Sequence, residues 1–344
     1  MCPDQLLQAG EAPEYATDPL CCGIFPSAAL AARLRQLPRL RSVQIHRSEL
    51  VTHGITWDTL LAILLVPHLQ EVKLTGMYIC PFSESTSGDD LRIDAHALAP
   101  ITTFHYQILD SPKAVSFEAE VAALAAVLTG LHEGLESLTL TSESAPLSTL
   151  ARLHWPCLRK LTFYGTPWEA PTPDIAALSM RMPRLRELSF RLYTSSRASV
   201  PRIYDDVYLP PHLVRLGLSS PNPRDKIFDR LPVTLRALSL RYWPHVHIQQ
   251  YLCDIGFVFD QPRYDCLLRS SDVLFIIRRC NNLGLDHLEI EYRADEEDEA
   301  LLRYMVQTFP NITSLKIHRH RSELEDHDVS VVSQADSLTK FTVY

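Results

Sequence analysis

Three residues in the second half of the chain have the side-chain types of a zinc site: His245, His247 and Cys253. Imidazole nitrogens and thiolate sulfur are the ligands that Zn²⁺ prefers, and a structural site takes four of them from two well-spaced pairs. A second pair is missing here, and none of the eight cysteines stands in a CxxC spacing. We therefore expect no metal and no cofactor.

A second histidine pair, His318 and His320, follows an apolar hexapeptide near the C-terminal end. Residues two apart in a strand point to the same face, so both imidazoles would lie side by side if the strand continues that far. We interpret them as part of a polar surface and not as a metal-ligand pair.

Two short charged motifs accompany the predicted strands and helices. The pentapeptide HRSEL occurs at His46–Leu50 and again at His320–Leu324. A shared turn that leaves the strand accounts for it, with a paired binding motif as the alternative. The acidic run Asp295–Glu299 precedes a predicted helix, where negative charge stabilises the positive end of the helix dipole. A basic partner is the alternative explanation for this run.

Motifs of the common nucleotide-binding and hydrolytic sites are absent from the sequence. It has no GxxxxGK[ST], GxSxG or GxGxxG pattern, and 11 glycines are few for loops that cradle phosphate. A Ser, His and Asp set drawn from distant parts of the chain would leave no local signature. We expect the protein not to be an enzyme.

The elements that would position these side chains come from a repeated six-residue phrase: apolar, two mostly polar, apolar, polar, apolar. Such internal repetition is the signature of a fold that grows by stacking similar units. The eleven copies are LRSVQI from Leu40, LQEVKL from Leu69, ITTFHY from Ile101, LESLTL from Leu135, LRKLTF from Leu158, LRELSF from Leu185, LVRLGL from Leu213, LRALSL from Leu235, LDHLEI from Leu285, ITSLKI from Ile312 and LTKFTV from Leu338.

Prolines stand in register with this phrase. Six copies have proline two residues before the first apolar position, although the chain holds only 24 prolines in 344 residues. Proline fixes its own φ and lacks an N–H donor, so it suits the connection ahead of a strand better than the strand interior. The six are Pro38, Pro67, Pro156, Pro183, Pro211 and Pro310.

Helix-like stretches separate the phrases. Apolar residues recur at three- and four-residue spacing from Trp57, from Phe117 and from Glu299, and Cys266–Cys280 is a further helix within the long gap before Leu285. A strand followed by a helix cannot bury its apolar face alone and must stack on its neighbours. The sequence thus predicts an α/β solenoid, a horseshoe with a curved parallel β-sheet on the concave face and helices on the convex face.

The phrase resembles the leucine-rich-repeat family over roughly Leu37–Tyr344. The asparagine that this family usually carries three residues after the phrase is absent, with Ser48, Met77, Glu143 and Thr166 among the replacements. The irregular spacing and the leading proline look like the repeats that follow F-box segments in fungal ubiquitin-ligase receptors. This resemblance implies a substrate-recognition role and a cullin-ligase adaptor as one partner.

The resemblance leaves two parts of the chain irregular. The N-terminal segment 1–36 contains LCCGIFPSAALAARL but lacks the length and the opening Leu-Pro of an F-box, so we assign it as a capping segment, or a diverged or truncated F-box remnant. Residues 37–344 form the predicted leucine-rich-repeat domain, with an irregular insertion near 243–281.

Composition restricts the class of partner. The net charge is −8 and the basic residues are scattered, so the chain offers no stripe for a nucleic-acid backbone. Its apolar runs are too short to span a bilayer, and residues 1–10 carry no basic signal-peptide start. We expect a cytoplasmic or nuclear protein that binds neither nucleic acid nor membrane.

Alternation along the strands predicts which side chains face away from the helices, and arginines and aromatics of the kind enriched at protein interfaces are among them. We expect this face to bind a protein; the alternative is that the chain regulates a partner enzyme as an inhibitor or activator. The predicted binding residues are His46, Glu71, Lys73, His105, Lys160, Tyr164, Glu187, Arg191, Tyr193, Arg215, Arg241, His287, Glu289, Lys316 and His318.

Overall fold

The computed structural model divides the chain into two compact units. Unit 1 comprises 1–165 and 181–184, and unit 2 comprises 166–180 and 185–344. Each unit is described by itself. The structure describes residues 27–46, 53–80, 93–108, 118–168, 178, 180–193, 209–219, 221–243, 266–280, 284–320 and 340–343.

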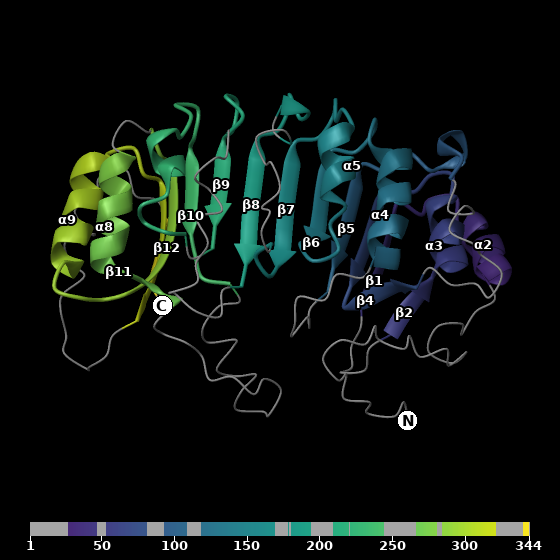
Figure 1. Ribbon diagram of the computed structural model, residues 1–344, viewed down its shortest axis with the longest axis horizontal. Helices are drawn as coiled ribbons and strands as arrows, with labels where there is room; N and C mark the ends of the chain where they lie inside the picture. Colours follow the sequence, from purple (N-terminus) through teal and green to yellow (C-terminus); the bar gives the residue numbers. More distant parts are fainter. Residues whose placement is uncertain are drawn as a thin grey trace. The chain divides into compact units, whose positions relative to one another are not determined.

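Unit 1 alternates strands with helices (Figure 1). Its elements are α2 (Ser27–Arg35), β1 (Ser42–His46), β2 (His53–Thr56), α3 (Trp57–Leu64), β3 (Glu71–Thr75), β4 (Met77–Cys80), the 3-10 helix η2 (Ala95–Ala97), β5 (Thr103–Gln107), α4 (Glu118–Leu131), β6 (Ser137–Thr141), α5 (Leu147–Arg152) and β7 (Lys160–Gly165).

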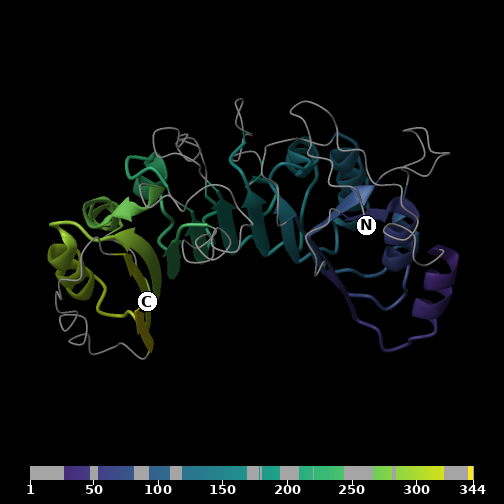
Figure 2. The ribbon, with the colours of Figure 1, turned by 90° about the horizontal axis from the view of Figure 1, so that it is seen from below.

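The strands of unit 1 form a parallel sheet in the order β1-β3-β5-β6-β7. Helices α3, α4 and α5 lie on one face of it (Figure 2). The side chain of Thr56 caps α3 by accepting a hydrogen bond from the Thr59 N–H, at 3.3 Å. Strands and helices therefore form two layers, and the opposite face of the sheet has no described helix on it.

Unit 2 continues the same alternation, with fewer helices among its described residues. Its elements are β8 (Glu187–Leu192), β9 (Arg215–Leu218), the 3-10 helix η4 (Lys226–Asp229), β10 (Ala237–Leu240), β11 (Leu268–Arg269), α8 (Ser270–Arg279), β12 (His287–Arg293), α9 (Asp298–Thr308), β13 (Ser314–His320) and β14 (Lys340–Val343).

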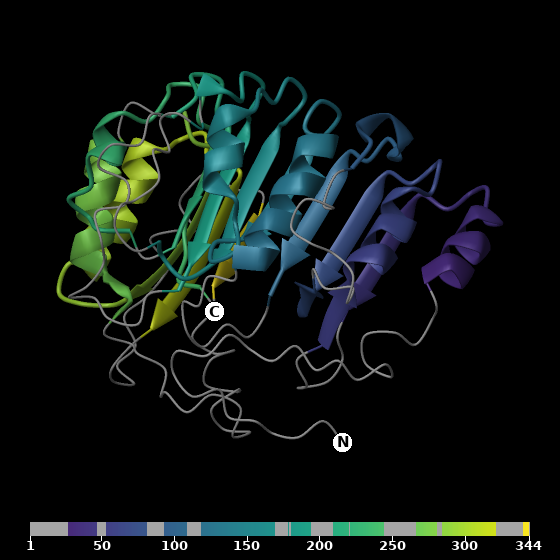
Figure 3. The same cartoon turned by 45° about the vertical axis from the view of Figure 1, so that its right-hand side comes forward.

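The strands of unit 2 are also parallel, in the order β8-β9-β10-β12-β13-β14, with the short β11 paired to the end of β12. Helices α8 and α9 pack side by side on one face of this sheet (Figure 3). The expected α/β architecture, a parallel sheet with helices, is confirmed in each unit.

All eleven phrases coincide with strands, and most of the strands start at the third residue of the phrase. The first leucine comes before the strand, at the end of a tight turn in which its N–H donates to the residue three positions earlier. Examples are Leu40 to Leu37, Leu69 to Val66 and Leu213 to Pro210, at 3.0 to 3.1 Å. The leading proline occupies the second position of these turns, where its fixed φ is favourable.

One backbone contact recurs between neighbouring strands. The carbonyl of the second phrase residue accepts the N–H groups of the second and third residues of the next phrase. Arg41 accepts from Gln70 and Glu71 at 2.8 and 3.0 Å, and Arg236 accepts from Asp286 and His287 at 2.9 and 3.1 Å. Adjacent strands are thus fixed in the same register.

Side-chain alternation places the core between strands and helices. In the phrases from Leu69 to the one at Ile312, the apolar residues at the first, fourth and sixth positions are buried, whereas Leu40, Val43 and Ile45 of the first phrase are half-buried. The largest buried side chains are Tyr106, Phe104, Trp155 and Phe163 in unit 1, and Tyr292, Phe190 and Phe228 in unit 2.

Two features were not anticipated from the phrase. Strands β2 and β4 pair in a separate two-stranded parallel sheet, and Gly76, with φ of 73°, makes the turn from β3 to β4.

The acidic run Asp295–Glu299 leads into a helix, α9, as expected. In addition, Asp295 accepts hydrogen bonds from the Ser271 N–H and hydroxyl at the start of α8. Asp298 pairs with Arg319. The run therefore caps and ties elements inside unit 2.

Several expectations fall on residues outside the described ranges. They concern His245, His247 and Cys253, most of both HRSEL pentapeptides, and most of segment 1–36. Helix α2 lies within the segment 1–36, and the helix predicted at Cys266–Cys280 is present as α8.

A carboxyl group is buried in the core of unit 1. Glu120 of α4 accepts hydrogen bonds on Oε1 from the Tyr106 hydroxyl and from the Ile79 N–H, the latter at 3.1 Å. Burial raises the pKa of Glu120 to about 7, and these two hydrogen bonds act in the opposite direction. Glu143, the nearby acidic side chain, adds to the rise.

This group makes the stability of the protein depend on pH. Because the native pKa of Glu120 lies near 7 and the ordinary value is 4.5, native Glu120 retains a proton that the unfolded chain releases between these values. The free energy of unfolding therefore falls as pH rises through this interval. In Glu120→Gln the amide oxygen can accept both hydrogen bonds, and we expect the fall, about 3 kcal/mol, to disappear. Urea denaturation at about pH 5 and about pH 8 measures it; an unchanged slope in the variant would contradict the assignment.

Candidate functional site

The face of each sheet opposite the helices presents the third and fifth residues of every phrase. We call these surfaces the unit 1 open face and the unit 2 open face. The first is formed by β1, β3, β5, β6 and β7, and the second by β8, β9, β10, β12 and β13. Because the strands are in register, equivalent residues form rows across each face, such as Ser189, Gly217, Ser239, Glu289 and Lys316.

On the unit 1 open face Glu71 is held by its neighbours. It contacts Lys73 of the same strand at 2.5 Å and accepts a hydrogen bond at 2.7 Å from the hydroxyl of Ser42. Ser42 is the residue in register with Glu71 on β1. The hydrogen bond to Lys73 and then that to Ser42 lower the pKa of Glu71, so the carboxylate is fully ionised at neutral pH.

The other predicted residues of unit 1 are spread along the face. The rings of His105 and Tyr164 approach each other, with centroids 6.4 Å apart, across β6. Burial lowers the pKa of His105, so its imidazole is neutral at pH 7. Lys160 and His46 are exposed at the start of β7 and the end of β1. Of the predicted unit 1 residues, the structure brings together Glu71 with Lys73, and His105 with Tyr164.

On the unit 2 open face the residues of β8 and β9 are the most exposed. Arg215 is 64% exposed and its Nε lies 3.5 Å from a carboxylate oxygen of Glu187. The guanidinium of Arg191 lies over the ring of Trp243, 5.4 Å from its centroid. Tyr193 differs from the expectation of a presented ring, because it packs edge-on against Tyr242, in a cluster with Cys266 and Leu267.

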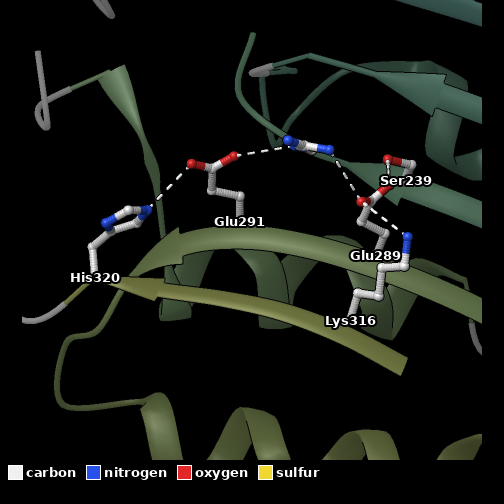
Figure 4. Close-up of polar contacts among 6 residues, drawn as sticks. Ser239, Glu289, Glu291, Lys316 and His320 are labelled. Atoms are coloured by element: carbon white, nitrogen blue, oxygen red, sulfur yellow. Dashed lines mark hydrogen bonds and ion pairs between the residues drawn. The ribbon is translucent and has the colours of Figure 1, made fainter. Parts of the chain in front are cut away.

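The residues of β10, β12 and β13 form a charge network around Glu289 (Figure 4). The Ser239 hydroxyl donates to Glu289 Oε2 at 2.8 Å, and Arg241 Nη1 donates to Oε1 at 3.4 Å. The ammonium of Lys316 lies 3.9 Å from the same Oε1. Burial acts to raise the pKa of Glu289, but the hydrogen bond from Ser239 and the two cations outweigh it, so the pKa is lowered.

The network extends along β12 to Glu291, whose side chain is fully buried. Glu291 Oε1 lies 3.2 Å from Nε2 of His320, and Oε2 lies 3.8 Å from Nε of Arg241. Arg241 therefore bridges both glutamates. A buried charge is costly when its counter-charge is missing. Removal of any one member of this network would therefore leave its partner buried and uncompensated, which destabilises the fold.

The histidines on this part of the face are buried, which corrects the expectation of a polar surface at His318 and His320. They are 6% and 8% exposed. Burial, and then the nearby Arg241 cation, lower the pKa of His318 to about 4. Burial also lowers the pKa of His287 at the edge of the network. The lowered pKa values keep both imidazoles uncharged at pH 7.

Sequence reasoning identified Arg241, Glu289 and Lys316 but missed Ser239, Glu291 and the role of His320. The missing signal is the length of the strands. Strands β12 and β13 run to Arg293 and His320, three residues beyond their six-residue phrases. Alternation continued to that point would have placed Glu291 beside Glu289 on the same face.

The chemistry of this cluster is that of a largely buried network of opposite charges. Among the described residues, no three His, Cys, Asp or Glu side chains gather as a metal site would require.

None of the helices in the described ranges is long and apolar enough to cross a membrane. No protein-family model matches the chain, and no curated protein matches it.

The burial of His318 predicts a second pH effect, opposite in sign to that of Glu120. The native pKa is about 4 and the ordinary value is 6.5, so the unfolded chain binds a proton in this interval that the native protein does not. The free energy of unfolding therefore falls as pH decreases from about 6.5 to about 4. Between about pH 7 and about pH 5 we expect His318→Gln to reduce that fall by roughly 2 kcal/mol.

Urea denaturation at about pH 7 and about pH 5 tests this effect, because the difference between the two measurements isolates the titration from any general loss of packing. His46→Gln is the matched control, since His46 is exposed at the end of β1. The assignment fails if the His318 and His46 variants have the same pH dependence.

Proposed function

We propose that this protein is a non-enzymatic protein-binding module, a leucine-rich-repeat horseshoe whose open faces form the concave side. The observation that carries the proposal is the unit 2 open face. There, exposed Arg191 and Arg215 lie beside the buried Glu289 and Glu291 network, and Trp243 contacts Arg191. Arginine and tryptophan are enriched among residues that dominate binding energy, and a rigid surface loses little entropy when it binds.

Within this class, the proposed role is the substrate-recognition subunit of an F-box-type ubiquitin ligase, or a relative of one. The resemblance of the proline-led phrase to fungal F-box repeats supports it. A cytoplasmic or nuclear location fits this role. In such a subunit the adaptor would bind the N-terminal segment 1–36 and the substrate would bind the open faces.

The test compares proteins that co-purify with the tagged chain and with a charge-reversed variant. Arg191→Glu with Arg215→Glu suits this purpose, because both side chains are exposed. Arg241 is unsuitable, since a carboxylate there would face Glu289 and Glu291. The matched control reverses Arg224 and Arg303, two exposed arginines of unit 2 that lie outside the strands.

We expect the amount of substrate protein that co-purifies with the open-face variant to fall at least tenfold, while the amount that co-purifies with the control variant is unchanged. Cullin-ligase subunits should remain near stoichiometric in both, because they bind elsewhere on the chain. Equal recovery of all partners by both variants would contradict binding through the open face. Mass spectrometry of the co-purified proteins, with circular dichroism to check folding, measures these outcomes.

Regulation of a partner enzyme is the alternative role for the same face. It predicts an enzyme among the co-purifying proteins, in place of cullin-ligase subunits, whose activity the purified chain changes. Arg215→Gln should remove that effect, because Arg215 is the most exposed cation measured on the unit 2 open face. An enzyme assay with the two purified proteins distinguishes this role from the ligase role.

A further inference from the structure

The unit 2 open face repeats one arrangement of serine and arginine. Strand β8 carries Ser189 and Arg191 at the positions that Ser239, in β10, and Arg241, directly after β10, occupy in the phrases LSFR and LSLR. In both phrases the two side chains lie on the open face, because they are two residues apart in a strand. The same pair of donors, a hydroxyl and a guanidinium, is therefore presented twice.

The second pair already holds a carboxylate. Glu289 of β12 is in register with Ser239 and accepts hydrogen bonds from the Ser239 hydroxyl at 2.8 Å and from Arg241 at 3.4 Å. The hydroxyl half of this arrangement also occurs in unit 1, where Ser42 donates to the in-register Glu71 at 2.7 Å. A serine that binds the glutamate of the next strand is thus a recurrent contact of these faces.

The first pair faces a glycine in place of the glutamate. Gly217 of β9 is in register with Ser189. The hydroxyl oxygen of Ser189 lies 2.7 Å from the position that a Cβ on Gly217 would take, so the hydroxyl points to where the side chain of the next strand would begin. Among the described residues, the position equivalent to Glu289 therefore has donors around it and no strand side chain that supplies a carboxylate.

The surroundings of Gly217 favour an anion. Arg215 lies two residues before it on the same face of β9, is 64% exposed, and lies 3.5 Å from Glu187, so among the described side chains Arg191 and Arg215 outnumber the one carboxylate beside them. Arg191 is exposed and its guanidinium lies over the ring of Trp243. A guanidinium above a ring can still donate to carboxylate oxygens, because its N–H groups point outward in its own plane. On the other side of Gly217 is Ser239, also in register, which adds no negative charge.

We propose that the row at Ser189 and Gly217 binds an acidic side chain, aspartate or glutamate, of an extended segment of the partner protein. The bound carboxylate takes the place that Glu289 occupies beside Ser239 and Arg241, with Ser189 and Arg191 as donors and Arg215 nearby. This inference rests on the proposed function, because it names the chemistry of the partner that the open face recognises.

The test uses fluorescein-labelled peptides of about ten residues, rich in aspartate and glutamate, with the purified full chain at low ionic strength. Companion peptides replace the acids by their amides, by lysine or by phosphoserine. Fluorescence anisotropy measures the affinities. We expect the acidic peptide to bind at least tenfold more tightly than the amide and lysine peptides, and no more weakly than the phosphoserine peptide.

Substitutions at Gly217 separate occupation of this row from general charge attraction. Gly217→Glu supplies the carboxylate from β9 itself and should weaken the acidic peptide about tenfold or more. Gly217→Gln has the same size without the charge and should weaken it no more than about threefold. In both variants the Ser189 hydroxyl must rotate, as the Ser239 and Glu289 pair shows is possible. Arg191→Gln should weaken the peptide about tenfold, whereas Arg303→Gln on α9 should not.

Equal weakening by the two Gly217 variants, tighter binding of the phosphoserine peptide, or equal affinity for all four peptides would each overturn the carboxylate assignment. So would the absence of binding by any peptide. None of these results affects the proposed function, which is judged by whether the reversed arginines lose the co-purified partner. If the reversed-arginine variant loses the co-purified partner but the acidic peptides do not bind, the chain is still a protein-binding module, and recognition through a single acidic side chain at this row is excluded.

Discussion

The fold depends on one repeated backbone contact, a carbonyl that accepts two N–H groups from the start of the next phrase. The leucine-rich-repeat family usually ties its turns with an asparagine side chain, and that residue is absent here. The carbonyl contact uses backbone atoms alone, so it tolerates any side chain at the second phrase position. Arg41, Gln70, Arg186 and Val214 all make it. Irregular connections of very different length can therefore lead into strands that share one register.

Fixed register decides which charges meet. In parallel strands with no offset, each open-face residue lies opposite the equivalent residue of the next phrase. Ser42 thereby meets Glu71, and Ser239 meets Glu289. Each contact joins residues of successive phrases, and a slip of one strand by a single residue would turn one of the two partners to the opposite face. These polar pairs thus favour the register that the buried leucines already require.

The sequence predicted the strands well because each phrase has a local period of two and six of the eleven follow a leading proline, and both signals lie within about ten residues. The sequence predicted less about which open-face side chains are buried. Alternation places His318 on the open face, but Arg241 comes from a strand almost eighty residues earlier, and its approach cannot be inferred from the local pattern. Strands β2 and β4 were missed because they follow the phrases and pair outside the main sheet.

Function in a repeat fold lies in the positions where one repeat differs from the next. Equivalent positions are interchangeable for the backbone, so a residue such as Gly217, which sits where other repeats carry Thr139, Ser239, Glu289 or Lys316, is not required by the fold. Its φ needs no glycine, since the positive-φ glycines among the described residues are Gly76 and Gly165, and glycine weakens a strand interior. The absence of a side chain at this position leaves room for the Ser189 hydroxyl, 2.7 Å from where a Cβ would lie, and for a ligand that approaches the strand closely.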